Sequence, residues 1–442
     1  MADFGRFLVD RGWAWASLAG VLLAALVFVL SVAGRDWAPI LVMATVPVQR
    51  SVLIGTDGHA LTWTQAAVAA FFAGAAIRFA ARSLTVRIDA PAILMGTVVV
   101  LYGLTISVAG DRGLWAAETY RWAIAGPFLI IARSYFSTRS ASKIAMALGA
   151  AVVVGFAWAA FQVASAEGPA SFVRSGLMRA HGGFGEPNPY AAFIWAVTLP
   201  LVALASMGRG YPGKVRWIAA AVGALGIAAL ILTQSRGGIL GIAVGLAVIA
   251  GVALLSLGTR TKLIGLSGAA ALGAAAIVIV TVAAPWRESH SATTPGNWAD
   301  QERTAHWVAA VHMVESHPLT GVGGGNFSSH YRAETGYWRF RISRGHAHNA
   351  YLQIAAEVGL PGMLGYACLL AAIVGSLIRR LRTTDGSWLA LGVAAVTMAL
   401  IVHQLVDYLH VLSLGLLFAG LWASALPSDS KGISSREHNI AA

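Results

Sequence analysis

Residues 345–362 read GHAHNAYLQIAAEVGLPG and stand where an arginine-rich polar segment changes into a long apolar one. The apolar segment that opens with Asn349 continues to about residue 378, which is longer than the roughly 20 residues that a spanning helix needs. We therefore expect His348 and Asn349 at the mouth of a membrane span, where water gives way to lipid. An imidazole can titrate near neutral pH, so this position suits proton chemistry on a membrane-held substrate.

Apolar runs of this kind recur along the whole chain, and the composition is that of an integral membrane protein. Apolar residues make up 57% and charged residues 11% of the chain, whereas a soluble domain carries about 25% charge. The mean hydropathy is +0.70. We expect an all-α polytopic membrane protein with about 12 transmembrane helices. The single Cys368 falls inside a span, which excludes an intrachain disulfide and argues against a thiolate metal site.

The apolar runs divide the chain into two membrane parts separated by one long loop. Spans are expected at 13–34, 63–81, 90–109, 115–135, 143–165, 189–207, 216–233, 237–257, 263–285, 349–378, 387–407 and 411–426. The stretch 38–55 is interrupted by prolines and by Arg50, and we interpret it as re-entrant or interfacial. The membrane domain thus covers 1–285 and 349–426, with an external catalytic loop at 286–347 and a tail at 427–442.

Charge decides the expected sidedness. With twelve spans both termini are cytoplasmic, and the lysines then all lie on the cytoplasmic side, as the positive-inside rule requires; they are Lys143, Lys214, Lys262 and Lys431. The net charge of +12 is therefore no sign of nucleic-acid binding. The external side carries arginine alone, which favours recognition of multi-oxygen anions because guanidinium offers paired donors. A genome-wide preference for arginine codons is the alternative.

The loop 286–347 contains two recognisable segments. A helix is expected over 298–316, with Arg303 in its second turn and an apolar stripe formed by Val308, Val311 and Val314. The segment 321–325 is rich in glycine, but it lacks the Lys-Ser/Thr ending of a nucleotide-binding loop. We interpret it as a sharp turn.

Two shorter external motifs precede spans. Residues 182–189 read GGFGEPNP, which predicts a rigid turn at a span entrance. Residues 233–238 read TQSRGG and join two spans so closely that Arg236 must lie at the membrane interface. An arginine at that depth is a functional candidate, and the alternative is that it reaches out to lipid phosphate.

Taken together, these motifs resemble those of the O-antigen ligase and polymerase family. The resemblance rests on an ordered set over about 165–365: the turn at 182–189, Ser235-Arg236-Gly237, Arg303 with Trp307, His317 to Gly321, Gly325-Asn326-Phe327, His348-Asn349, Leu352, Glu357, Gly359 and Gly362. Each motif is degenerate alone, and the order makes the set specific.

The resemblance implies a glycosyltransferase of the bacterial inner membrane that works on the periplasmic face. Such enzymes move a glycan from undecaprenyl diphosphate to an acceptor, with inversion and without a metal or other cofactor. Ligases use the lipid A core, polymerases use a second lipid-linked repeat, and related members use protein hydroxyls. We favour a ligase, with membrane lipids as its other partners.

The family's functional residues match Arg236, Arg303 and His348 here. A diphosphate leaving group gains negative charge, which arginines can stabilise in place of a metal, and the acceptor hydroxyl needs a base. We therefore expect both arginines to bind the diphosphate and His348 to accept the proton of the acceptor hydroxyl. The alternatives for His348 are a helix-capping role and replacement by the neighbouring His346.

Other polar residues are expected around this site or within the spans. Further substrate contacts are expected from Arg344, Asn349, Asn188, Arg341 and His346. Glu357 is expected to make a structural hydrogen bond beside a kink, because Pro361 cannot donate to its carbonyl. Arg121 either lines a cavity or pairs with Glu118, three residues earlier.

Two functions of other classes fit the sequence less well than transfer does. A transporter or flippase for the same lipid needs inverted repeats and a midplane site, but the sequence shows no internal repeat and its polar motifs gather on one face. A structural membrane subunit leaves the ordered external motifs unexplained.

Overall fold

The computed structural model describes residues 2–49, 51–54, 60–137, 139–174, 176–255, 298–335, 345–383 and 387–426. In these parts the chain is nearly all helix, as expected, and its sheet content is two short antiparallel hairpins. These are β1 (Ser51–Ile54) with β2 (Ala60–Thr62), and β3 (Val173–Arg174) with β4 (Leu177–Met178).

The helices in chain order are α1 (Ala2–Val32), α2 (Trp37–Thr45), α3 (Trp63–Ala80), α4 (Ala90–Leu104), α5 (Arg112–Ala132), α6 (Ser140–Ser165), α7 (Pro187–Met207), α8 (Gly213–Thr233), α9 (Arg236–Leu255), α11 (Trp298–Ser316), α12 (Phe327–Glu334), α13 (Ala350–Thr383), α14 (Trp388–His403) and α15 (Leu414–Ala425). Short 3₁₀ turns lie at η1 (Thr105–Ser107), η2 (Ala170–Phe172) and η3 (Gly182–Phe184).

Six of the described helices are long and apolar enough to cross a membrane, and three more are apolar but shorter. The expected count of about 12 is therefore not confirmed, and the expected span 263–285 lies outside the described residues. The most enclosed of the six is α7, with 78% of its apolar window buried. It packs against α8, α9 and α14, so this helix stands at the centre of the bundle.

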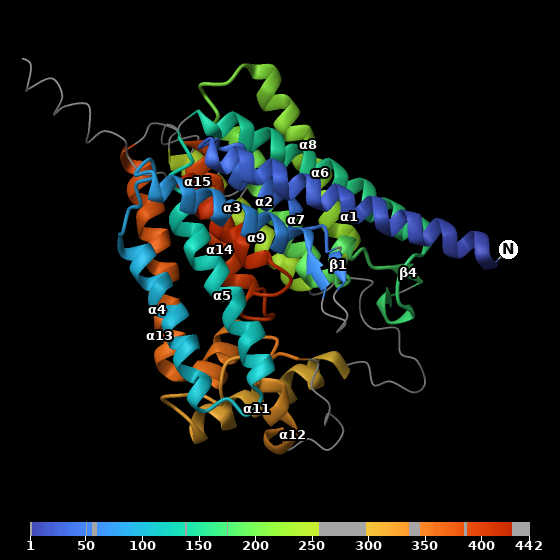
Figure 1. The fold of residues 1–442 in the computed structure, drawn as a ribbon, viewed down its shortest axis with the longest axis vertical. Helices are drawn as coiled ribbons and strands as arrows, with labels where there is room; N and C mark the ends of the chain where they lie inside the picture. Colours follow the sequence, from blue (N-terminus) through green and yellow to red (C-terminus); the bar gives the residue numbers. More distant parts are fainter. Residues whose placement is uncertain are drawn as a thin grey trace, which may run out of the picture.

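One end of the bundle is tied together by ion pairs. Lys143 Nζ lies 2.6 Å from Asp36 Oδ1, and Arg133 Nη2 lies 2.8 Å from Asp89 Oδ2. Arg133 also donates to the carbonyl of Leu426, after α15. The positive-inside rule predicts that this lysine-bearing end faces the cytoplasm, and we call it the cytoplasmic end for that reason. The helices α11 and α12 lie at the opposite end (Figure 1).

The contacts around α2 differ from the re-entrant turn expected for 38–55. Asp36, before α2, lies at the cytoplasmic end beside Lys143, whereas the Thr45 carbonyl, at the end of α2, accepts from Thr64 at the start of α3. The chain over 37–49 thus runs from one end of the bundle to the other. Pro39 stands in the first turn of α2, where its missing N–H costs no hydrogen bond, so the prolines do not turn the chain back.

This course of the chain also bears on the expected position of the N-terminus. Because α1 ends beside Asp36 at the cytoplasmic end, its first residues lie away from that end, where Figure 1 marks the N-terminus. If the positive-inside rule holds, the N-terminus then lies outside the cytoplasm, which differs from the expectation of two cytoplasmic termini and stays a prediction.

Helices α11 and α12 and the glycine-rich segment 321–325 pack against α13, which is kinked. Gly359 has φ 75° and ψ 178°, and the carbonyls of Ala356 and Glu357 accept from the N–H groups of Val322 and Gly323 at 2.8 and 3.0 Å. The kink expected beside Pro361 is confirmed. The glycine-rich segment is a turn packed between that kink and the end of η1, because a Cβ at residue 321 would meet the backbone of Glu357 and one at residue 323 would meet Ala109.

Helix α11 has the expected bounds but buries another face. Ala305, Ala309 and Met313 are fully buried, whereas Val311 is 41% exposed. Of the expected valine stripe, Val314 packs against the buried cluster and Val311 does not, because α11 approaches α13 and α12 closely and small side chains permit that approach.

Candidate functional site

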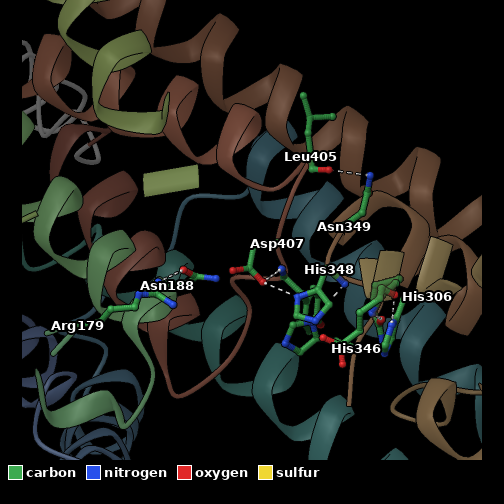
Figure 2. A network of polar contacts seen from close by, with 12 residues as sticks. Arg179, Asn188, His306, His346, His348, Asn349, Leu405 and Asp407 are labelled. Carbon is green, nitrogen blue, oxygen red and sulfur yellow. Dashed lines mark hydrogen bonds and ion pairs between the residues drawn. The ribbon is translucent and has the colours of Figure 1, made fainter. Parts of the chain in front are cut away.

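The centre of the candidate site is formed where the start of α13 meets the loop 404–413, which joins α14 to α15. The N–H of Ala350 donates to the Gln404 carbonyl at 2.9 Å, and the side-chain amide of Asn349 donates to the Leu405 carbonyl at 3.0 Å (Figure 2). The Asn349 oxygen accepts from the N–H groups of Tyr351 and Leu352, which caps the helix. Asn349, expected to contact substrate, holds these two segments together.

His348 and Asp407 face each other across this junction (Figure 2). His348 Nδ1 lies 3.6 Å from Asp407 Oδ1, and their side chains are 18% and 5% exposed. The separation is that of an ion pair and is longer than a hydrogen bond. His348 has φ 51°, a left-handed conformation that is uncommon outside glycine, and this sharp turn directs the imidazole toward Asp407.

Two further imidazoles surround His348 (Figure 2). Its ring centroid lies 4.4 Å from that of His346 and 5.5 Å from that of His306. The N–H of His348 donates to His346 Nδ1 at 3.3 Å. His306 is fully buried, donates from Nδ1 to the Glu302 carbonyl at 2.7 Å and stacks on Tyr331. His348, the candidate base, is therefore packed against His306 of α11 and His346 of its own loop.

On the far side of Asp407 lies a pocket rich in arginine, which we call the arginine pocket. It is lined by Arg174, Arg179, Asn188, Gln234, Arg236, Gly237, Arg303, His403, Val406 and Asp407. The structure thus brings together three residues that sequence motifs singled out separately, namely Asn188, Arg236 and Arg303. Arg179 donates to the Asn188 side-chain oxygen at 3.2 Å (Figure 2) and to the Thr233 carbonyl at 3.0 Å.

The sequence around Arg236 explains how it reaches this pocket. Gln234 ends α8 in a left-handed conformation, with φ 51°, and the chain reverses at once. The Ser235 hydroxyl accepts from the N–H of Gly238 at 3.2 Å and caps α9. A Cβ at Gly237 would lie 2.5 Å from the His403 ring. Glycine therefore lets α9 start against α14, which places Arg236 at the helix entrance.

Charge in the arginine pocket is unbalanced among the residues that line it, since four arginines surround the one carboxylate of Asp407. Burial, together with repulsion from Arg174, Arg303 and Arg236, lowers the pKa of Arg179 to about 9. Arg179 remains charged at neutral pH, and the pocket favours an added anion.

The same surroundings act on the two groups beside His348. Burial raises the pKa of Asp407, but contact with His348 and the charges of nearby imidazoles outweigh it and hold that pKa below its ordinary value. Burial, reinforced by neighbouring cations, lowers the pKa of His346 to about 4. At neutral pH the site therefore holds an ionised Asp407 and a neutral His346.

Three ligand-type atoms in this site could hold a metal ion. One atom each from His346, His348 and Asp407 lie within 4.8 Å of one another, a set of two imidazoles and a carboxylate that suits zinc or another transition metal. The adjoining arginines oppose a divalent cation. The expectation of a metal-independent reaction remains a prediction, which treatment of the purified protein with a chelator tests.

Some residues of the candidate site were not expected from the sequence, and some expected ones cannot be placed. Arg341 and Arg344 lie outside the described residues. Asp407, Arg179 and His306 were not singled out. Asp407 fell at the end of an expected span, where an acidic side chain is itself a signal of function.

A family model described as O-antigen ligase matches residues 219–367. This match covers about a third of the chain and supports its resemblance to the O-antigen ligase and polymerase family. The matched part contains Arg236, Arg303 and His348, whereas Arg179, Asn188 and Asp407 lie outside it. No curated protein matches the sequence significantly.

Proposed function

We propose that this protein transfers a glycan from undecaprenyl diphosphate to the lipid A core on the periplasmic face of the inner membrane. The observation that carries the proposal is the contact of two unlike sites at Asp407. One is the arginine pocket, with its surplus of positive charge, and the other is the His348–Asp407 pair. The first suits a diphosphate and the second suits proton removal from a hydroxyl.

In the proposed reaction the diphosphate lies in the arginine pocket, and Arg236 and Arg303 bind its oxygens. The bond between the anomeric carbon and the phosphate oxygen breaks, and the electron pair leaves with undecaprenyl diphosphate. Guanidinium groups stabilise that charge through paired hydrogen bonds. In this way the arginines replace the divalent metal ion that stabilises other phosphate leaving groups.

The acceptor hydroxyl attacks the anomeric carbon from the face opposite the diphosphate, which inverts the configuration. His348 receives the hydroxyl proton. Since Nδ1 faces Asp407, we assign Nδ1 as the N–H that donates toward the carboxylate, and Nε2 as the basic nitrogen. The imidazolium formed is then stabilised by Asp407, as in other histidine–carboxylate pairs. The 3.6 Å separation shortens when substrate binds, as is common for catalytic hydrogen bonds.

The test is reconstitution with purified protein, an undecaprenyl-diphosphate-linked glycan and lipopolysaccharide that lacks O-antigen. The expected product is lipopolysaccharide that carries the glycan. Chain growth on the lipid-linked glycan itself, without modification of lipopolysaccharide, would contradict ligation and indicate a polymerase. Transfer to neither acceptor would contradict the proposed function altogether.

A further inference from the structure

A second cavity, of about 440 Å³, lies beside the loop 404–413 and apart from the residues that line the arginine pocket. It is enclosed by the middle of α5, the start of α3 and the start of α15. Its polar lining residues are Gln49, Thr62, Gln65, Tyr120, Arg121, His410 and Ser413. We call it the α5 cavity, and the reaction described above gives it no role.

The single arginine that lines the α5 cavity is paired with a carboxylate, whereas four arginines and one carboxylate line the arginine pocket. Arg121 Nη1 lies 2.5 Å from Glu118 Oε2, and the Glu118 side chain is 5% exposed while that of Arg121 is 45% exposed. Arg121 thus both pairs with Glu118 and lines a cavity, so the two interpretations left open by the sequence are both confirmed. Arg121 meets the cavity with its charge already compensated, which favours a neutral hydroxyl over an anion.

The other polar groups of the cavity are neutral. Gln49 donates from its amide nitrogen to the carbonyls of Val46 and Leu412, which leaves its side-chain oxygen as an acceptor. Gln65 accepts from the Thr62 N–H at 2.9 Å, which leaves its amide N–H groups as donors. Tyr120 is 42% exposed and adds an aromatic face with a polar tip. Donors, acceptors and a ring of this kind match a sugar.

A chain of contacts joins the α5 cavity to the His348–Asp407 pair. The Tyr408 hydroxyl donates to Glu118 Oε1, and the Tyr408 ring lies 6.0 Å from that of His346, which in turn contacts His348. Asp407 lines the arginine pocket and His410 lines the cavity. Three residues of extended chain span at most about 11 Å, so one acceptor molecule can reach from the cavity to the base.

We propose that the α5 cavity binds a hydroxyl-rich, uncharged sugar of the acceptor glycan, with Arg121, Tyr120 and the two glutamines as its contacts. Donor and acceptor then approach the His348–Asp407 pair from two different pockets, one cationic and one neutral. This proposal rests on the proposed function for the identity of the reaction, but binding of the sugar can be measured without turnover.

The experiment fills the cavity without breaking a hydrogen bond. Ala117 lines the cavity and is exposed, so Ala117→Trp introduces bulk there. Ala69→Trp, at an exposed alanine of α3 that does not line the cavity, is the matched control. The probe is core oligosaccharide released from lipopolysaccharide, and its binding to purified protein is measured by calorimetry. We expect Ala117→Trp to weaken binding about tenfold or more and Ala69→Trp to leave it unchanged.

A second readout separates the acceptor from the donor. In the transfer assay, Ala117→Trp and Tyr120→Ala are expected to raise KM for whichever acceptor the wild-type protein uses, with KM for the lipid-linked donor unchanged. A rise in KM for the donor alone would overturn the proposal by assigning the cavity to the donor's sugar. Absent or unaltered oligosaccharide binding would overturn it too. Weakened binding in Ala117→Trp without any wild-type transfer would uphold the cavity and contradict the proposed function.

Discussion

His348 Nδ1 lies 3.6 Å from the carboxylate of Asp407, because the chain just before α13 meets the chain just after α14. Their separation is fixed by backbone contacts, since Asn349 donates to the Leu405 carbonyl and Ala350 to that of Gln404. The imidazole is therefore oriented by the fold before any substrate binds. In the proposed reaction the carboxylate selects the tautomer of His348 and stabilises its protonated form.

Replacing Asp407 with asparagine tests that orientation. The Asp407→Asn variant would keep the size of the side chain but lose the negative charge that stabilises the imidazolium, so kcat is expected to fall about 100-fold or more. KM for the donor should change little. The measurement is initial transfer rate at varied donor concentration, and a variant with wild-type kcat would remove Asp407 from the mechanism.

The arginine pocket should depend on guanidinium geometry as well as on charge. Arg236→Ala and Arg303→Ala are expected to abolish or strongly weaken transfer, and the corresponding lysine variants should recover only part of it, because a point charge cannot form paired hydrogen bonds. Arg332→Ala, at an exposed arginine of α12, is the control and should stay active. Full activity in both lysine variants would mean that the pocket acts by general attraction alone.

Those features of the fold that recur along the chain could be predicted from the sequence. Apolar runs predicted the helical membrane class, and Pro361 predicted the kink at Gly359. The course of 37–49 could not be predicted from composition. A proline in the first turn of a helix costs no hydrogen bond, so it is as compatible with a helix that crosses the bundle as with a chain reversal. The buried face of α11 was missed for a related reason. Where α11 packs closely against its neighbours, the small residues Ala305 and Ala309 are buried, although alanine is less hydrophobic than the exposed Val311.

The site was predictable only where a motif carried it. Arg236, Arg303 and His348 each stand in a recognisable pattern, and the described structure brings the two arginines to one pocket beside Asp407. Arg179 and Asp407 stand in no pattern of spacing with them. Their role arises from contacts between segments that are distant along the chain, which only the three-dimensional structure reveals.

Acid conditions should destabilise the protein partly through His346. Its pKa is lowered to about 4 in the folded state, from an ordinary value of 6.5, so the unfolded state binds the proton first. Stability supplied by neutral His346 is thus present above about pH 6.5 and is lost as the pH falls toward 4. His346→Asn should show a smaller drop in Tm between pH 7 and pH 5 than the wild type does.

The same variant bears on activity. Because His346 stays neutral down to about pH 4, its protonation cannot cause a loss of transfer between pH 7 and pH 5. His346→Asn should keep substantial activity and the same acid limb in its pH profile. A shifted acid limb would show that His346 carries the titration that limits transfer.

Chelation tests the metal-independent reaction. His346, His348 and Asp407 offer three ligand atoms close together, so a bound ion is the direct rival to catalysis by arginine and a free imidazole. Transfer by purified protein is expected to survive EDTA treatment and dialysis. Loss of activity that magnesium, manganese or zinc restores would assign these residues to a metal instead of to proton transfer.

The central claim is that His348 removes the acceptor proton while the arginine pocket holds the donor. The measurement that tests it most directly is a pair of assays on purified His348→Ala: glycan transfer, and binding of the undecaprenyl-diphosphate-linked donor. Loss of a general base costs about 100- to 10,000-fold in rate, so transfer should become undetectable while donor binding persists, and His346→Ala should remain active. Transfer at the wild-type rate by His348→Ala would contradict the account.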